Sequence, residues 1–182
     1  MKNDLNQEKL KFPTGKFLRP DPISKNDLET WIATIENFPS NLKILTSTLS
    51  VEELNWIYRP KGWNIKQVVH HCADSHINSF IRFKLALTED VPTIKPYEEA
   101  LWAELADGNS NDILPSLQII EGVHTRWVLL LKSLGSTELK RQFFHPENLK
   151  IASLEETIGV YAWHCNHHLA HIKQALLHKG QF

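Results

Sequence analysis

The chain has little glycine, little cysteine and no long apolar run. Of its 182 residues, 7 are glycine and 2 are cysteine. So few glycines disfavour a β-sandwich or barrel with many tight turns. Cys72 and Cys165 are too few for a disulfide scaffold, so we expect a cytoplasmic protein. The longest apolar run, Trp127 to Leu131, is far shorter than the roughly 20 residues of a membrane helix, and no secretory signal is expected because Met1 leads into no apolar segment.

An excess of charge of one sign is also lacking. The 20 Lys and Arg residues nearly balance 21 Asp and Glu residues, which gives a formal net charge of −1. Without a run of basic residues there is no track for phosphates, so we expect neither a nucleic-acid nor a membrane partner. The 42% hydrophobic content is that of an ordinary globular protein, and the length fits one domain.

The pattern of breaks and apolar spacings predicts an N-terminal arm followed by one helical domain. Residues 1–23 are polar and rich in proline, so we expect a flexible or extended arm. Residues 24–182 form the single domain. Apolar positions at helical spacing, together with capping residues, predict long helices over about 25–48, 64–88, 115–134 and 153–178. In the first of these, Pro39 predicts a kink or a break.

Short extra helices are predicted over 50–54 and 97–106, whereas residues 141–152 have no clear pattern. Four substantial helices with few strand candidates favour an all-α fold, specifically a four-helix bundle with short extra helices and an extended N-terminal arm.

Histidine is abundant and unevenly placed. Four of the 10 histidines lie within residues 164–171, in the last predicted helix. At 100° per residue, these four fall within an arc of about 100° on the apolar side of the helix. Buried imidazoles without partners cost on the order of 1–3 kcal/mol each, and a bound metal would offset this cost. Histidines at i and i+4 can share one ion, so His164/His168 and His167/His171 are both candidate pairs.

A third ligand is available in the other long histidine-bearing helix. His70 and His71 are adjacent there, so at most one of them faces the bundle axis. We favour His71, which aligns with apolar Val68, and place His70 at the surface or beside a ligand. Three imidazoles would leave a fourth position open, as in catalytic zinc sites. Ligand type alone does not separate Zn²⁺ from Ni²⁺ or Fe²⁺.

The alternative to a functional metal site is a polar seam or an adventitious metal binder. Each single histidine is more often structural than ligating, and we place His76, His124, His145 and His178 in that class. Cys72 and Cys165 are interpreted as small buried residues.

Several motifs are specific enough to suggest a family. They include Tyr58-Arg-Pro-Lys-Gly-Trp63, Gln67-Val-Val-His-His-Cys-Ala-Asp-Ser-His76 and Tyr161-Ala-Trp-His-Cys-Asn-His-His-Leu-Ala-His-Ile172. In these motifs the chain resembles the DinB-like superfamily, and within it the YfiT-like metal-dependent hydrolases. The resemblance implies a cytoplasmic homodimer that binds one divalent metal per subunit, most simply Zn²⁺ with Ni²⁺ as the second choice. Carried over by position, the ligands would be His71, His164 and His168.

The resemblance leaves the reaction open. In the first hypothesis the metal activates water to hydrolyse a small-molecule substrate, with His167, His171 or Asp74 orienting ligands or moving protons. In the second, the metal binds a low-molecular-weight thiol of the bacillithiol type for transfer, as in related DinB-like proteins. Arg82 and Arg126 would then hold cofactor carboxylates. The third hypothesis is a metal-binding dimer without catalytic activity.

Overall fold

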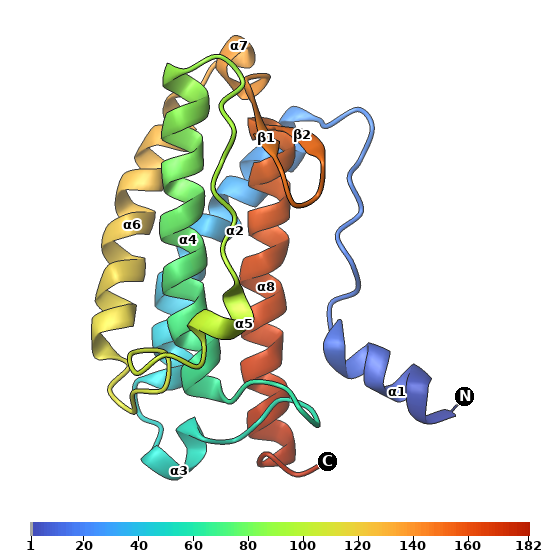
Figure 1. The fold of residues 1–182 in the computed structure, drawn as a ribbon, viewed down its shortest axis with the longest axis vertical. Helices are drawn as coiled ribbons and strands as arrows, with labels where there is room; N and C mark the ends of the chain where they lie inside the picture. Colours follow the sequence, from blue (N-terminus) through green and yellow to red (C-terminus); the bar gives the residue numbers. More distant parts are fainter. Residues whose placement is uncertain (1) are drawn as a thin grey trace.

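Four long helices form the body of the protein. The computed structural model describes residues 2–182, with side chains from residue 7 onward. The long helices are α2 (Lys25–Thr46), α4 (Ile65–Thr88), α6 (Leu114–Ser133) and α8 (Leu154–His178). Both α2 and α4 pack against α6 and α8, so the four helices enclose one apolar core (Figure 1). The predicted all-α four-helix bundle is confirmed.

The helix starts follow from local capping chemistry. The side chains of Ser24, Asn64 and Ser153 each accept a hydrogen bond from the backbone N–H three residues later, so they cap α2, α4 and α8. Such a cap satisfies one of the donors that a helix N-terminus leaves without a partner and is worth about 1 kcal/mol. These three boundaries were therefore predictable from the sequence.

Shorter elements connect the long helices. They are α1 (Lys2–Lys11), α3 (Val51–Leu54), α5 (Glu99–Trp102), α7 (Ser136–Leu139), β1 (Gln142–His145) and β2 (Lys150–Ser153). The two strands pair antiparallel, with Gln142 opposite Ser153. This hairpin occupies the stretch whose pattern was unclear. Phe143 is the only buried residue of its two strands, so the hairpin lacks the alternation that identifies a half-buried strand.

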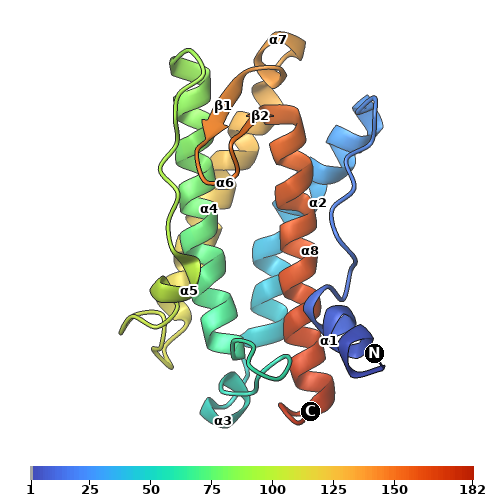
Figure 2. The same cartoon turned by 45° about the vertical axis from the view of Figure 1, so that its right-hand side comes forward.

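The N-terminal arm is only partly extended. The prediction of an extended segment is wrong for Lys2–Lys11, which form α1. This stretch contains helix-forming Lys, Leu, Gln and Glu residues and no proline, so helix formation is favourable. From Phe12 to Ile23 the arm has neither helix nor strand. It runs beside α8 (Figure 2), where the indole N–H of Trp163 donates to the carbonyl of Gly15 at 2.8 Å.

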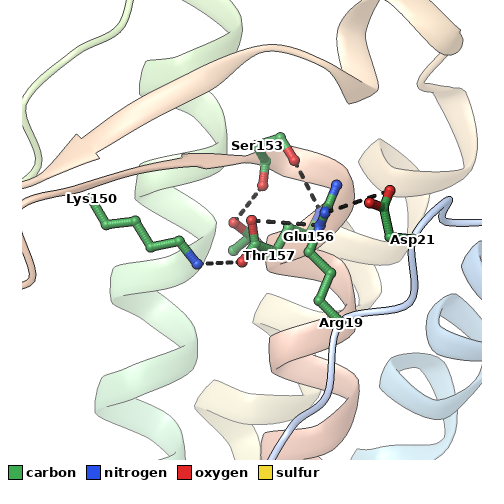
Figure 3. A network of polar contacts seen from close by, with 6 residues as sticks. All are labelled: Arg19, Asp21, Lys150, Ser153, Glu156 and Thr157. Carbon is green, nitrogen blue, oxygen red and sulfur yellow. Dashed lines mark hydrogen bonds and ion pairs between the residues drawn. The ribbon is translucent and has the colours of Figure 1, made fainter.

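The arm and the hairpin meet at the start of α8. Glu156, in the first turn, receives the Lys150 ammonium of β2 at 2.5 Å and the Arg19 guanidinium of the arm at 3.9 Å (Figure 3). Arg19 also lies 3.9 Å from Asp21. A carboxylate near a helix N-terminus is favoured by the helix dipole. These contacts hold the arm and the hairpin at one end of α8, the helix that carries five of the ten histidines.

Pro39 does not interrupt α2, so the predicted break is wrong. A proline inside a helix removes the hydrogen bond to the carbonyl four residues earlier, here that of Ile35. That carbonyl instead lies 2.7 Å from Nδ1 of His124 on α6. A buried side chain thus replaces the missing backbone donor, and the helix continues to Thr46.

Among residues 2–182, no helix combines the length and the apolar character that crossing a membrane requires.

Candidate metal centre

Three imidazoles converge where α4 and α8 lie side by side. His71 comes from α4, whereas His164 and His168 occupy successive turns of α8. Nε2 of His164 lies 3.3 Å from Nε2 of His71 and 3.1 Å from Nε2 of His168. Of the two i, i+4 pairs that spacing left open, the structure brings His164 and His168 to His71.

The spacing of these nitrogens fits a small divalent cation. Zinc binds histidine nitrogen at about 2.0–2.1 Å with tetrahedral geometry, which places two ligand nitrogens about 3.3–3.4 Å apart. The two observed separations lie at or slightly below this value. Three imidazoles would fill three of the four ligand positions of such an ion. The donor set and its spacing therefore suit a zinc-type ion with one corner left for a further ligand.

Burial keeps the three imidazoles uncharged. It lowers the pKa of His71 to about 4, helped by the nearby imidazole of His167. It also lowers the pKa values of His164 and His168 well below their ordinary value, and neighbouring histidines act in the same direction. Desolvation disfavours the charged form of a base. At neutral pH each imidazole therefore keeps one nitrogen lone pair, which is the form that binds a metal.

The other histidines predicted on α8 lie close to the centre. Nδ1 of His171 lies 3.4 Å from Nδ1 of His168, and its Nε2 lies 3.1 Å from the carbonyl oxygen of Lys11. The His167 ring stacks on Trp163, with centroids 4.4 Å apart. Its Nδ1 is buried and has no hydrogen-bond partner among the described residues.

Two residues of α4 lie away from the centre. Asp74 does not contact the three histidines through any hydrogen bond of the described residues, and burial followed by the nearby Asp107 raises its pKa. His70 is buried, so the predicted surface position is wrong. Its Nδ1 lies 2.8 Å from the Ser116 hydroxyl, and its Nε2 lies 3.0 Å from the carbonyl of Ser110.

Sequence reasoning missed two histidines that connect to the centre. Nε2 of His76 lies 3.1 Å from Nδ1 of His164, and Nδ1 of His76 lies 2.7 Å from Nε2 of His124. His76 and His124 were both assigned to the general structural class. His124 is isolated in its helix, so its spacing gave no signal. The available signal was Pro39, which frees a carbonyl inside a predicted helix and so calls for a buried donor.

A cleft of about 670 Å³ is lined by the three histidines together with His167 and His171. Its wall also includes the cationic residues Lys11, Arg59, Lys61, Arg82 and Lys150 and the acidic residues Glu99, Glu147 and Glu156. Nε of Arg59 and Nε of Arg82 are buried without a hydrogen-bond partner among the described residues. Arg126, the other arginine proposed for cofactor carboxylates, instead stacks over Phe80 at 5.4 Å.

Residues 34–172 match the model of the DinB superfamily. The chain belongs to the DinB superfamily. The match covers the histidines of α4, α6 and α8 described above. It leaves out α1, the extended arm and the last turns of α8.

Among DinB superfamily proteins, this chain is similar to several from bacilli. It is 43% identical over 165 residues to "Putative metal-dependent hydrolase YfiT" of Bacillus subtilis (strain 168), a match that covers 91% of this chain and 93% of the relative. It is 46% identical over 167 residues to "Putative metal-dependent hydrolase BH0277" of Halalkalibacterium halodurans, covering 92% and 96% of the two chains.

A solved structure agrees with the fold. The structure of YfiT from Bacillus subtilis superposes with a TM-score of 0.91 at 42% identity, covering 94% of this chain and 98% of that one. It is described as a "probable metal-dependent hydrolase with an unusual four-helix bundle topology". The resemblance inferred from the sequence motifs is confirmed by these matches.

Proposed function

We propose that this chain is a metal-dependent hydrolase of a small molecule. One divalent ion per chain, zinc in the first place and nickel in the second, would be held by Nε2 of His71, His164 and His168. The observation that carries the proposal is the position of Nε2 of His164, which lies 3.3 Å from Nε2 of His71 and 3.1 Å from Nε2 of His168 in the wall of a cleft. The names of similar proteins support the same reaction class.

The ion would supply Lewis-acid chemistry, polarising a substrate oxygen and lowering the pKa of water. Residues of the chain itself would transfer protons and bind the substrate. His167 reaches the cleft with Nδ1 free to hold a proton. Arg59 and Arg82 present buried Nε–H groups, which suit an anionic group of the substrate. Tyr58 stacks on His171 at 3.8 Å and so closes one side of the histidine cluster.

An activity screen tests the proposal. Zinc-loaded protein, protein treated with a chelator, and the His164→Ala variant would be assayed on a panel of small esters and amides that includes anionic members. We expect turnover only by the loaded wild type, with anionic members preferred. Equal turnover by all three proteins would contradict the proposal. Stoichiometric zinc binding without turnover on any panel would favour the non-catalytic metal-binding alternative.

A thiol transferase is the second candidate, and one observation favours it. The unpartnered Nε of Arg82 lines the cleft, as a residue that holds a cofactor carboxylate would. A coordinated thiol is deprotonated at neutral pH and attacks electrophiles. Assays of the zinc-loaded protein with an electrophile, with and without a low-molecular-weight thiol, separate the candidates, because only the transferase requires the thiol.

A further inference from the structure

A row of three histidines, His124, His76 and His164, begins at the carbonyl group of Ile35. Because Pro39 has no N–H, this carbonyl lacks its helical donor, and Nδ1 of His124 lies 2.7 Å from it. A carbonyl oxygen accepts hydrogen bonds and never donates them. The proton of this contact must therefore sit on Nδ1 of His124. That single requirement determines the positions of the protons in the whole row.

The assignment passes from ring to ring. A neutral imidazole carries one N–H, so Nε2 of His124 is an acceptor and Nδ1 of His76, 2.7 Å away, must donate to it. Nε2 of His76 is then an acceptor. It lies 3.1 Å from Nδ1 of His164, which must donate in turn. Nε2 of His164 is therefore left without a proton, and it is the nitrogen that faces His71 and His168.

The surroundings of the row keep its rings neutral. His76 is 0% exposed and His124 is 1% exposed. Their ring neighbours are Phe38, Trp127 and Tyr161. A charge placed among these apolar rings would be strongly disfavoured. Because each ring is neutral and the proton of His124 is fixed on Nδ1, only one set of tautomers is possible for the three rings.

We propose that His124 and His76 are positioning residues that fix the Nδ1–H tautomer of His164 and thereby direct its Nε2 lone pair to the metal. This inference rests on the proposed function, because it assigns the ligand atom of that same site. It extends the site beyond His164 by two imidazole rings, from the cleft to the backbone of α2. Pro39 contributes because it has no N–H, which leaves the carbonyl of Ile35 available to His124.

The second ligand on α8 has a parallel arrangement. Nε2 of His171 lies 3.1 Å from the carbonyl of Lys11, the last residue of α1, so the proton sits on Nε2. Nδ1 of His171 is then an acceptor for Nδ1–H of His168, at 3.4 Å. Nε2 of His168 is thus also left without a proton. Both ligands from α8 point the same nitrogen at the centre. His164 is connected to a backbone carbonyl through two further histidines, and His168 through one.

Nitrogen-15 NMR of the histidine rings tests the assignment without metal or substrate. Protonated and unprotonated ring nitrogens have well-separated shifts, so each tautomer is read directly. In metal-free wild type at neutral pH we expect Nδ1–H tautomers for His124, His76 and His164. An Nε2–H tautomer at any of the three would overturn the proposal. Because this readout needs no metal, it remains valid even if the proposed hydrolase function fails.

Two variants of His76 test the consequence for metal binding. His76→Phe keeps a ring of similar size but removes the acceptor, whereas the side-chain oxygen of His76→Gln can take the place of Nε2. Loss of an outer hydrogen-bond partner of a metal ligand weakens binding by about 10–100-fold. We expect this loss of zinc affinity for His76→Phe and recovery close to wild type for His76→Gln.

Unchanged affinity in His76→Phe would contradict the positioning role, and equal losses in both variants would indicate a packing role instead. Circular dichroism checks that each variant folds. If wild type itself fails to take up zinc, the proposed function fails, whereas the tautomer measurement still decides the proton assignment. If His76→Phe does not fold, that same measurement on wild type decides the proposal.

Discussion

Acid should lower the free energy of unfolding of the metal-free protein. The titration of His124 alone sets a lower limit on this loss. Burial lowers the pKa of His124 to about 4, partly offset by its hydrogen bond to Ile35. In the unfolded chain the pKa is about 6.5, so between these values the unfolded state binds the extra proton and stability falls as pH falls. From pH 7 to pH 5, one such group lowers the free energy of unfolding by about 2 kcal/mol.

The loss in the whole protein should exceed this figure. Burial also lowers the pKa values of His76, His164 and His168, so their titration acts with the same sign. A total of several kcal/mol is a large part of the 5–15 kcal/mol stability of an ordinary domain. The assay is urea denaturation at pH 7, 6 and 5 in the presence of a chelator.

A matched variant isolates the contribution of His124. His124→Asn keeps a donor for the carbonyl of Ile35 but does not titrate in this range. We expect its loss of stability between pH 7 and pH 5 to be smaller than that of wild type by about 2 kcal/mol. Equal pH dependence in the two proteins would refute the reasoning. His178→Asn, an exposed position at the end of α8, serves as the control and should behave as wild type does.

Five further outcomes are expected. Gly159→Ala should lower the free energy of unfolding by about 1 kcal/mol, because the new Cβ would lie 2.8–2.9 Å from Phe17 and Trp31. Gly122→Ala has open space around the new Cβ and should raise the free energy of unfolding by about 1 kcal/mol in the same denaturation assay. His167→Gln should reduce kcat about 100-fold with zinc affinity unchanged, as loss of a proton acceptor does; an unchanged kcat would remove His167 from the reaction. Arg82→Gln should raise KM for anionic substrates more than for neutral ones. Light scattering should find the homodimer implied by the family resemblance, and a monomer at all concentrations would contradict it.

The long helices were predictable because local chemistry determines them. Ser24, Asn64 and Ser153 mark helix starts by their side chains alone, and apolar spacing gives the buried faces. The errors fall where tertiary contacts decide. The pattern around Pro39 indicates a break, but a donor 89 residues away restores the lost hydrogen bond. The hairpin of β1 and β2 contacts α4 and α8, whereas its own sequence carries little strand signal.

The centre itself was predictable only in part. Helical geometry placed His164, His167, His168 and His171 on one face. The structure buries the last three and leaves His164 half-buried in the wall of the cleft. Spacing did not distinguish the two i, i+4 pairs, because the pair is determined by the position of His71 on another helix. Periodicity did not reveal His76 and His124 for the same reason, and the only sequence signal was Pro39, which frees a carbonyl that calls for a buried donor. Their partners lie on other helices, so no periodicity within one helix identifies them.

The most direct test of the account is the zinc stoichiometry of the metal-free protein, measured by titration calorimetry. Wild type and the exposed-site control His178→Ala should each bind one equivalent per chain. The affinity should hold down to about pH 6 and fall as the pH approaches about 4, the pKa to which burial lowers the ligand His71. The variant with alanine at His71, His164 and His168 together should fold but show no stoichiometric binding. One equivalent of zinc bound by this triple variant as tightly as by wild type would contradict the central claim.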